Sequence, residues 1–316
     1  MIICLGTTPA LQRTMQFASL EIGQVNRASH VHTGASGKSI NVARVLHTLG
    51  HPVLATGFLG GPSGDIIRRD LDQSGISHDF VAVPVPTRTC TTVIDHTHGT
   101  ATELIEESAP VDADAWSRLD ELLKSHLLRA TALVLSGTIA GGTGDDFYAC
   151  CVRLARIHAI PTIVDAAGAA LRLALNERPA AIKPNRAELA TTIDSTLDAE
   201  ERGDLAESDL HAAAIGLATL SDWVFITLGP AGAIAADREH LYRAASPPVK
   251  AISPIGSGDS FTAAIAIAIT TKMNLPNALR LATAAGAANT LTPDPGHLQA
   301  ADVHRLQPLV GVTTIR

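Results

Sequence analysis

The sequence predicts an α/β protein built on a mostly parallel central sheet with helices on both faces, together with a small separate β-sheet. Beyond about residue 112, apolar strand-like runs alternate with helical runs, which is typical of parallel strands joined by right-handed crossovers. The β-rich pieces near 13–33 and 88–105 lie outside that alternation and are expected to form a sheet of their own. The content of 46% hydrophobic and 17% charged residues indicates a globular protein with a large core.

Composition and charge argue against several classes of protein. The formal charge of −7 disfavours non-specific nucleic-acid binding, which needs a basic face. No run reaches the roughly 18 apolar residues of a membrane span. The cysteines, Cys4, Cys90, Cys150 and Cys151, show no CxxC spacing, so we expect reduced thiols and a cytoplasmic location. We find no repeat, low-complexity tract or linker, and we expect one domain over residues 1–316.

The elements of the first half follow from short patterns. The apolar run at residues 2–5 has no basic lead-in, so it is expected to be a buried strand rather than part of a signal peptide. Apolar residues at 42, 45, 46 and 49 follow helical spacing, and Gly50 is a suitable end for that helix. The remaining expectations are strands at 53–59, 78–85, 88–95 and 100–105, a loop at 60–65, and a short amphipathic helix from 66 to 75.

The second half predicts the parallel part of the sheet. Strands at 131–135 and 161–164 alternate with helices at 112–129, 145–158 and 169–175. In sheets of this kind, ligands bind beyond the carboxyl ends of the strands. Polar and glycine residues follow predicted strands in five places, so we expect them on one rim: 136–137, Asp165, 183–185, 227–229 and 256–259.

A glycine-rich turn at residues 254–260 leads into an apolar, alanine-rich helix. Gly256 and Gly258 lack a Cβ, so the backbone on either side of Ser257 can approach a ligand closely. The unpaired N–H groups of the first helical turn and the helix dipole attract phosphate. Asp259 has two interpretations: it caps the helix, or it accepts the proton of an attacking hydroxyl.

Three further runs are ambiguous when taken alone. Gly37-Lys38-Ser39 looks like the end of a P-loop, but that pattern needs a glycine where the chain has His32, and a solvated lysine at a helix start is an alternative. In the run 182–189, Asn185 can cap a helix with Glu188 completing something close to a capping box. The run 224–234 fits an ordinary hairpin with glycine at positive φ.

Taken in order, these motifs resemble those of the ribokinase-like (PfkB) sugar kinases, in the branch of 1-phosphofructokinase and tagatose-6-phosphate kinase. The resemblance runs from about residue 1 to about residue 300. Residues 36–43 match Gly-Gly-Lys-Gly-x-Asn-x-Ala with two glycines replaced by serine, Thr87-Arg88 match Thr-Arg, 183–188 match Lys-Pro-Asn-x-x-Glu, and 256–259 match Gly-Ala-Gly-Asp. The resemblance implies a ribokinase-like three-layer α/β/α sandwich with a β-sheet lid that is often used for homodimer contact. It also implies ATP-dependent phosphorylation of a sugar phosphate hydroxyl with Mg²⁺.

The resemblance also implies which residues contact the sugar phosphate. Lys38 would neutralise a phosphate already on the substrate, and Asn41 would bond a sugar hydroxyl. Arg88 would be a second phosphate ligand with a bidentate fork, although a lone surface arginine on an edge strand is the alternative. The full expected substrate-binding set is Gln12, Arg27, Gly37, Lys38, Asn41 and Arg88.

The nucleotide side is implied in the same way. In the family, Asn185 and Glu188 organise Mg²⁺ mostly through its waters, which suits an ion that keeps a hydration shell. Asp259 would be the base, and the backbone of Gly256, Ser257 and Gly258 would hold the transferring phosphoryl group. The expected cofactor-binding residues are Lys183, Asn185, Thr227, Gly229, Gly232 and Asn289, the last of them beside the adenine.

The sugar-binding motifs depart from the family pattern more than the catalytic ones. Gln12 replaces an acid that grips sugar hydroxyls in the family, and Thr8 stands where the family has Asn. Residues 104–108 replace an Asn-Glu-Pro-Gly run. Two other functions therefore stay open: a kinase for an unphosphorylated sugar or a nucleoside, and a non-catalytic regulator that binds nucleotide or sugar.

Overall fold

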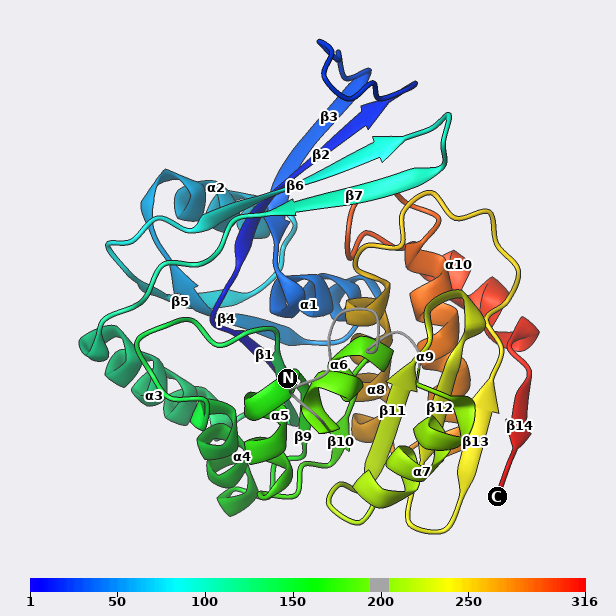
Figure 1. The fold of residues 1–316 in the computed structure, drawn as a ribbon. Helices are drawn as coiled ribbons and strands as arrows, with labels where there is room; N and C mark the ends of the chain where they lie inside the picture. Colours follow the sequence, from blue (N-terminus) through cyan, green and yellow to red (C-terminus); the bar gives the residue numbers. More distant parts are fainter. Residues whose placement is uncertain (194–204) are drawn as a thin grey trace.

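The computed structural model describes residues 1–193 and 205–316, and its main body has three layers, helices–sheet–helices (Figure 1). Within those ranges, ten strands form one sheet in the order β14-β13-β12-β11-β10-β9-β8-β1-β4-β5. Four other strands form a separate sheet in the order β3-β2-β6-β7. The predicted α/β sandwich with a small additional sheet is therefore confirmed.

The main sheet is parallel from β5 to β11 and antiparallel from β11 to β14. Both faces of its first strand are buried: Ile2 and Cys4 pack into one core, and Ile3 and Leu5 pack into the other. The strands are β1 (Ile2–Gly6), β4 (Val53–Leu59), β5 (His78–Ala82), β8 (Ala132–Ser136), β9 (Thr162–Asp165), β10 (Ala181–Ile182), β11 (Trp223–Thr227), β12 (Ala233–Ala236), β13 (Leu241–Ala244) and β14 (Val312–Thr314).

Two groups of helices cover the two faces of this sheet. One core lies beneath α1 (Lys38–Thr48), α2 (Gly61–Gln73), α8 (Ser257–Thr270), α9 (Leu275–Asn289) and α10 (Ala300–Leu306). The other lies beneath α3 (Ala113–Leu127), α4 (Phe147–Ile157), α5 (Gly168–Leu175), α6 (Arg186–Ile193) and α7 (Glu207–Leu217). Alanine is frequent in α8 and α9, and its small side chain lets these two buried helices pack closely together. Short 3₁₀ turns lie at Gly229–Ala231 and Gln307–Leu309.

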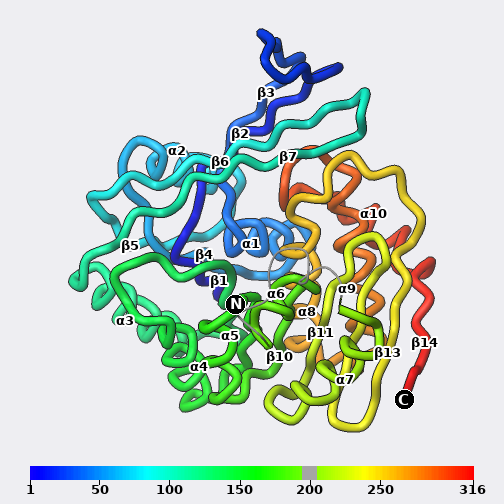
Figure 2. The backbone as a smooth tube through the Cα atoms, viewed as in Figure 1, coloured from blue at the N-terminus to red at the C-terminus, as the bar shows by residue number. Residues whose placement is uncertain are grey.

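The small sheet stands away from the main body as a lid (Figure 2). It consists of β2 (Ala10–Phe17), β3 (His30–Ser36), β6 (Arg88–Asp95) and β7 (Thr100–Ile105). The predicted strands at 88–95 and 100–105 pair as an antiparallel hairpin. The N-terminal piece begins at residue 10 rather than 13, and its two strands are joined by the long segment between Phe17 and His30.

The predicted loop at 60–65 is wrong, because α2 already begins at Gly61. Pro62 explains the difference: proline lacks a backbone N–H and has a φ suited to a helix, so it is well tolerated in the first helical turn. The predicted buried strand at the N-terminus is confirmed as β1. In the part of the chain that the structure describes, no helix combines the length and the hydropathy needed to cross a membrane.

Candidate active site

A cavity of about 730 Å³ opens at the carboxyl ends of the parallel strands, between the lid and the main body. It brings together almost all of the residues that the sequence motifs singled out. Its wall includes Gln12, Arg88, Cys90, Glu103 and Ile105 from the lid; Gly37, Lys38 and Asn41 at the start of α1; Lys183, Asn185, Glu188, Thr227, Gly229 and Gly232 after the strands; and Gly256, Ser257, Gly258, Asp259 and Thr283 from α8, α9 and the preceding turn.

The glycine turn before α8 forms one end of the cavity floor. Gly256 is the N-cap of α8 with φ 82°, and a Cβ there would lie 2.7 Å from Pro295 Cα, so only glycine fits without a shift. In the described chain, no acceptor is bonded to the backbone N–H of Gly258 or of Asp259. Two amide donors at the positive end of a long helix therefore face the cavity, which is the arrangement that binds phosphate.

Asp259 is not the cap of this helix, so that alternative is wrong. The cap position belongs to Gly256, without any side-chain bond, and Asp259 lies in the first turn with its carboxylate directed to α1. Its Oδ2 accepts a hydrogen bond from Asn41 Nδ2 at 2.7 Å. Burial, reinforced by the charge of Asp165, raises the pKa of Asp259 to about 7, although Lys38, Asn41 and Lys183 favour the ionised form.

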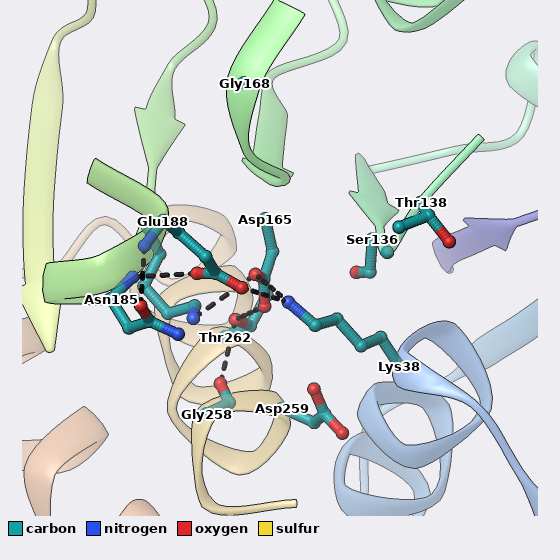
Figure 3. Close-up of polar contacts among 12 residues, drawn as sticks. Lys38, Ser136, Thr138, Asp165, Gly168, Asn185, Glu188, Gly258, Asp259 and Thr262 are labelled. Carbon is teal, nitrogen blue, oxygen red and sulfur yellow. Dashed lines mark hydrogen bonds and ion pairs between the residues drawn. The ribbon is translucent and has the colours of Figure 1, made fainter. Parts of the chain in front are cut away.

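Asp165, at the end of β9, holds two lysines at the centre of the site (Figure 3). Its Oδ1 accepts from Lys38 Nζ at 3.1 Å and from Lys183 Nζ at 3.2 Å, and its Oδ2 accepts from Thr262 Oγ1 at 2.7 Å. Burial raises the pKa of Asp165, but Lys183, Lys38 and the Thr262 hydroxyl outweigh it and hold the pKa below its usual value. Lys183 also reaches the glycine turn, since a Cβ on Gly258 would lie 3.4 Å from its Nζ.

Lys38 is not a solvated helix-start lysine. Besides Asp165, its Nζ donates to Glu188 Oε1 at 2.8 Å, so one ammonium group lies between two carboxylates. Burial opposes its charge, but Asp165, Glu188 and Asp259 outweigh burial and raise the pKa of Lys38. It therefore stays a cation on the cavity wall over the whole physiological range.

The capping box at the start of α6 is confirmed and coexists with a place on the cavity wall. Asn185 N donates to Glu188 Oε2, and Glu188 N donates to Asn185 Oδ1, both at 2.8 Å. In the described ranges no three His, Cys, Asp or Glu side chains are placed to hold a metal directly. One carboxylate and one amide beside the cavity fit an Mg²⁺ ion that keeps most of its waters, and they do not fit a dehydrated one.

The lid wall carries a cation and a neutral amide. Arg88 donates from Nη1 to Glu106 O and from Nη2 to Thr8 O, and its Nε is buried with no partner in the described chain. Backbone carbonyls thus position the guanidinium without neutralising its charge. Gln12 is buried and donates from Nε2 to Thr92 Oγ1 at 2.8 Å.

On the nucleotide side, the predicted hairpin is confirmed as β11 and β12, and its turn also lines the cavity. Gly229 and Gly232 both have positive φ, at 58° and 93°. Asn185 and Thr227 are joined by an isolated parallel bridge, which ties this turn to the start of α6. Thr283 of α9 was missed: its buried hydroxyl lines the cavity without a hydrogen-bond partner in the described residues, and no sequence motif marks it.

Two predicted site residues do not reach the cavity. Asn289 is fully buried, accepts from Ser260 Oγ and Gly296 N and donates to Ile255 O, so its side chain does not line the cavity in which the adenine contact was expected. These hydrogen bonds of the Asn289 amide hold the glycine turn against α9. Arg27 lies exposed in the segment between β2 and β3, outside the lining of the cavity.

Asn41 also differs from expectation, because its amide is already engaged. Its Oδ1 accepts from Ser36 Oγ at 2.9 Å while its Nδ2 donates to Asp259. Asp165 is the residue whose role the sequence did not reveal. Its position directly after a buried strand placed it on the predicted rim, but nothing in the sequence indicated that it would join two lysines.

Comparison with known proteins agrees with this geometry. The model of the pfkB family carbohydrate kinases matches residues 1–300. A possible 1-phosphofructokinase from Thermotoga maritima superposes with a TM-score of 0.90 at 23% identity, covering 100% of this chain and 99% of that one. Escherichia coli phosphofructokinase-2 with substrates and products gives a TM-score of 0.85 at 24% identity, covering 97% of each chain.

A tetrameric inhibited form of the same Escherichia coli enzyme is similar to the same degree. Its TM-score is 0.85 at 25% identity, covering 97% of this chain and 98% of that chain. These likenesses extend over nearly the whole of each chain, so both the lid and the three-layer body have counterparts in solved structures. The family match over residues 1–300, together with the cavity that its motifs line, shows that the chain belongs to the pfkB family of carbohydrate kinases.

Proposed function

We propose that the protein transfers the γ-phosphoryl group of ATP to a hydroxyl of a sugar phosphate, as a 1-phosphofructokinase or tagatose-6-phosphate kinase does. One observation carries this proposal more than any other. The buried Asp259 carboxylate lies at the same cavity floor as two unbonded backbone N–H groups and the Lys38–Asp165–Lys183 cluster. A base, an anion cradle and fixed cations are the parts that phosphoryl transfer needs.

Asp259 would accept the proton of the acceptor hydroxyl. As that proton moves to the carboxylate, a bond forms between the hydroxyl oxygen and the γ-phosphorus, and the bond from this phosphorus to the ADP oxygen breaks. The free N–H groups of Gly258 and Asp259 would bind the γ-phosphoryl oxygens, whose charge they stabilise. Lys183, close to the same turn, would support that charge.

Arg88 and Lys38 favour an acceptor that already carries a phosphate. Both cations line the cavity, and the guanidinium of Arg88 has no carboxylate within ion-pair distance in the described chain. An arginine fork fits a phosphate in a bidentate manner. A neutral sugar or a nucleoside would leave this charge without a partner, so the phosphorylated acceptor is preferred.

Mg²⁺ would be held through water by Glu188 and Asn185, and when bound it would neutralise nucleotide phosphate charge. Glu188 is paired with Lys38. A lysine that turned to a phosphate would release this carboxylate for the hydrated ion.

The lid is our candidate for homodimer contact, because Ile22 and Val25 at its tip are 97% and 83% exposed.

The proposal is tested with a panel of hexoses and hexose phosphates and ATP, measuring ADP release and the phosphorylated product. We expect turnover with at least one hexose monophosphate, and kcat/KM for it well above that for any free hexose. Turnover of free sugars or nucleosides alone would contradict the phosphorylated acceptor. ATP and sugar binding without turnover would favour the regulator that the altered sugar motifs leave open.

Replacing Arg88 tests the phosphate role directly. Arg88→Ala is expected to raise KM for the hexose phosphate by roughly 10-fold or more, since a charge-assisted bond is lost, with a much smaller effect on KM for ATP. Arg118→Ala, on the exposed face of α3, is the matched control and should change neither constant. Equal increases of both KM values in Arg88→Ala would contradict the assignment.

A further inference from the structure

Three acidic side chains line the cavity within the described residues, and they differ in their hydrogen-bond and ion-pair partners. Glu188 pairs with Lys38, and Asp259 accepts from Asn41. Glu103, on lid strand β7, is exposed to solvent and has no hydrogen bond or ion pair in that part of the chain. A carboxylate that faces a ligand cavity without a partner is placed to accept hydrogen bonds from the ligand.

The register of the lid places Glu103 beside the altered sugar-binding residue. Thr92 of β6 is directly opposite Glu103 of β7, and Gln12 of β2 donates to the Thr92 hydroxyl at 2.8 Å. Side chains alternate along a strand, so these residues share one face with Cys90 and Ile105. Gln12, Cys90, Glu103 and Ile105 of this face line the cavity. Gln12 lies in the row of Cys90 and Ile105, and Glu103 lies in the next row, opposite Thr92.

The charges on this face are arranged along its length. Arg88 lies at the start of β6, near the main body, and Thr92 with its neighbour Glu103 lies four residues further along the strand. Glu103 is an exposed residue, yet desolvation of its carboxyl by the surrounding atoms raises its pKa, and the Arg88 guanidinium opposes that rise. A phosphate is attracted to the Arg88 end and repelled from the Glu103 end, whereas a hydroxyl is a suitable donor to Glu103.

We propose that Glu103 determines acceptor specificity by accepting hydrogen bonds from hydroxyl groups of the bound sugar phosphate. The lid thereby supplies a charge-assisted acceptor from β7, while Gln12 on β2 offers only a neutral amide. Glu103 also orients the substrate, because its charge excludes the phosphate from the outer end of the lid face. This inference rests on the proposed function and names a residue that selects the acceptor for it.

The test measures the dissociation constant of each sugar phosphate in the panel by calorimetry, independently of turnover. Glu103→Gln keeps the size of the side chain and removes its charge, so affinity should fall by roughly 10- to 100-fold. Glu107→Gln, an exposed glutamate just beyond the same strand and outside the cavity lining, is the matched control and should bind like the wild type. ATP affinity should change by less than about threefold in both variants.

A series of mono-deoxy analogues identifies the hydroxyl and separates a contact from a general effect. Wild-type protein should lose affinity for one analogue, and Glu103→Gln, whose amide oxygen accepts a weaker hydrogen bond from the same hydroxyl, should lose clearly less affinity for that analogue. Equal affinity of wild type and Glu103→Gln for the parent sugar would overturn the role of Glu103. Sugar binding without phosphorylation by the wild type would overturn only the proposed function, and binding of no sugar in the panel would overturn both.

Discussion

At the scale of single residues, Asp259 combines a chemical advantage with a cost to stability. Burial raises its pKa to about 7, so the carboxyl group is close to half-ionised at neutral pH and is a stronger base than an ordinary aspartate. The Asn41 amide bonded to Oδ2 fixes the direction of the carboxylate. The same burial leaves a charge in a poorly solvated place whenever Asp259 is ionised.

The pH dependence of catalysis follows from this pKa. The base must be deprotonated to accept the hydroxyl proton, so kcat/KM should rise with pH and level off above an apparent pKa near 7. Initial rates at subsaturating sugar phosphate over about pH 5 to pH 9 measure it. If kcat/KM instead fell only below an apparent pKa near 4, the pKa of a solvent-exposed aspartate, the result would contradict a buried base.

The stability of the ligand-free protein should respond in the opposite direction. The folded pKa lies above the usual value of 3.8, so this group stabilises the fold fully below about pH 4 and loses that contribution as pH rises through about 7. Asp259→Asn removes the buried charge, and the difference in pKa corresponds to at most about 4 kcal/mol. We expect a Tm several degrees above wild type at about pH 8.5 and no gain at about pH 4. A lower Tm for Asp259→Asn at the alkaline pH would contradict this account.

At the scale of elements, the glycine turn and α9 act together. Asn289 of α9 bonds to Ser260, Ile255 and Gly296, so the turn is held by a side chain that does not itself line the cavity. Gly256 then takes a left-handed conformation against Pro295. The two free N–H groups depend on this geometry, because a displaced turn would aim them elsewhere.

A Cβ at Gly256 should therefore lower the catalytic rate as well as the stability of the fold. Gly256→Ala imposes positive-φ strain of about 1–2 kcal/mol and a contact 2.7 Å from Pro295 Cα, so we expect a lower Tm and kcat reduced by roughly 10-fold or more. Gly216→Ala is the control: Gly216 lies inside α7 with nothing within 4 Å of an added Cβ, and alanine there should stabilise by about 0.4–1 kcal/mol. Unchanged kcat in Gly256→Ala would show that the turn tolerates displacement.

Local patterns predicted most of the elements and only some of their roles. The hairpin at β11–β12 and the capping box at Asn185 and Glu188 were both recognisable, because each depends on neighbours within a few residues. The start of α2 was missed, since Gly61 and Pro62 look like a loop until the helix that follows them is known. Asn289 was assigned to the nucleotide because its motif shows only that it lies near the site, not which way its amide points.

At the scale of the whole molecule, the site joins segments that are distant in sequence. Lys38 follows the first lid hairpin and Asp165 ends β9, yet their side chains are 3.1 Å apart because both lie at the carboxyl edge of the same sheet. The order of β and α segments predicted that edge. It could not predict the Lys38–Asp165–Lys183 contacts, which depend on side-chain directions that only the packed fold defines.

Proton acceptance by Asp259 is the central claim, and the turnover of Asp259→Asn tests it most directly. The substitution should lower kcat by about 10²–10⁴-fold with the hexose phosphate that the wild type uses best, while the dissociation constant for ATP stays within severalfold. Asp145→Asn, at an exposed site away from the cavity, should retain wild-type kcat. An Asp259→Asn enzyme that turns over within about threefold of the wild type would contradict the account.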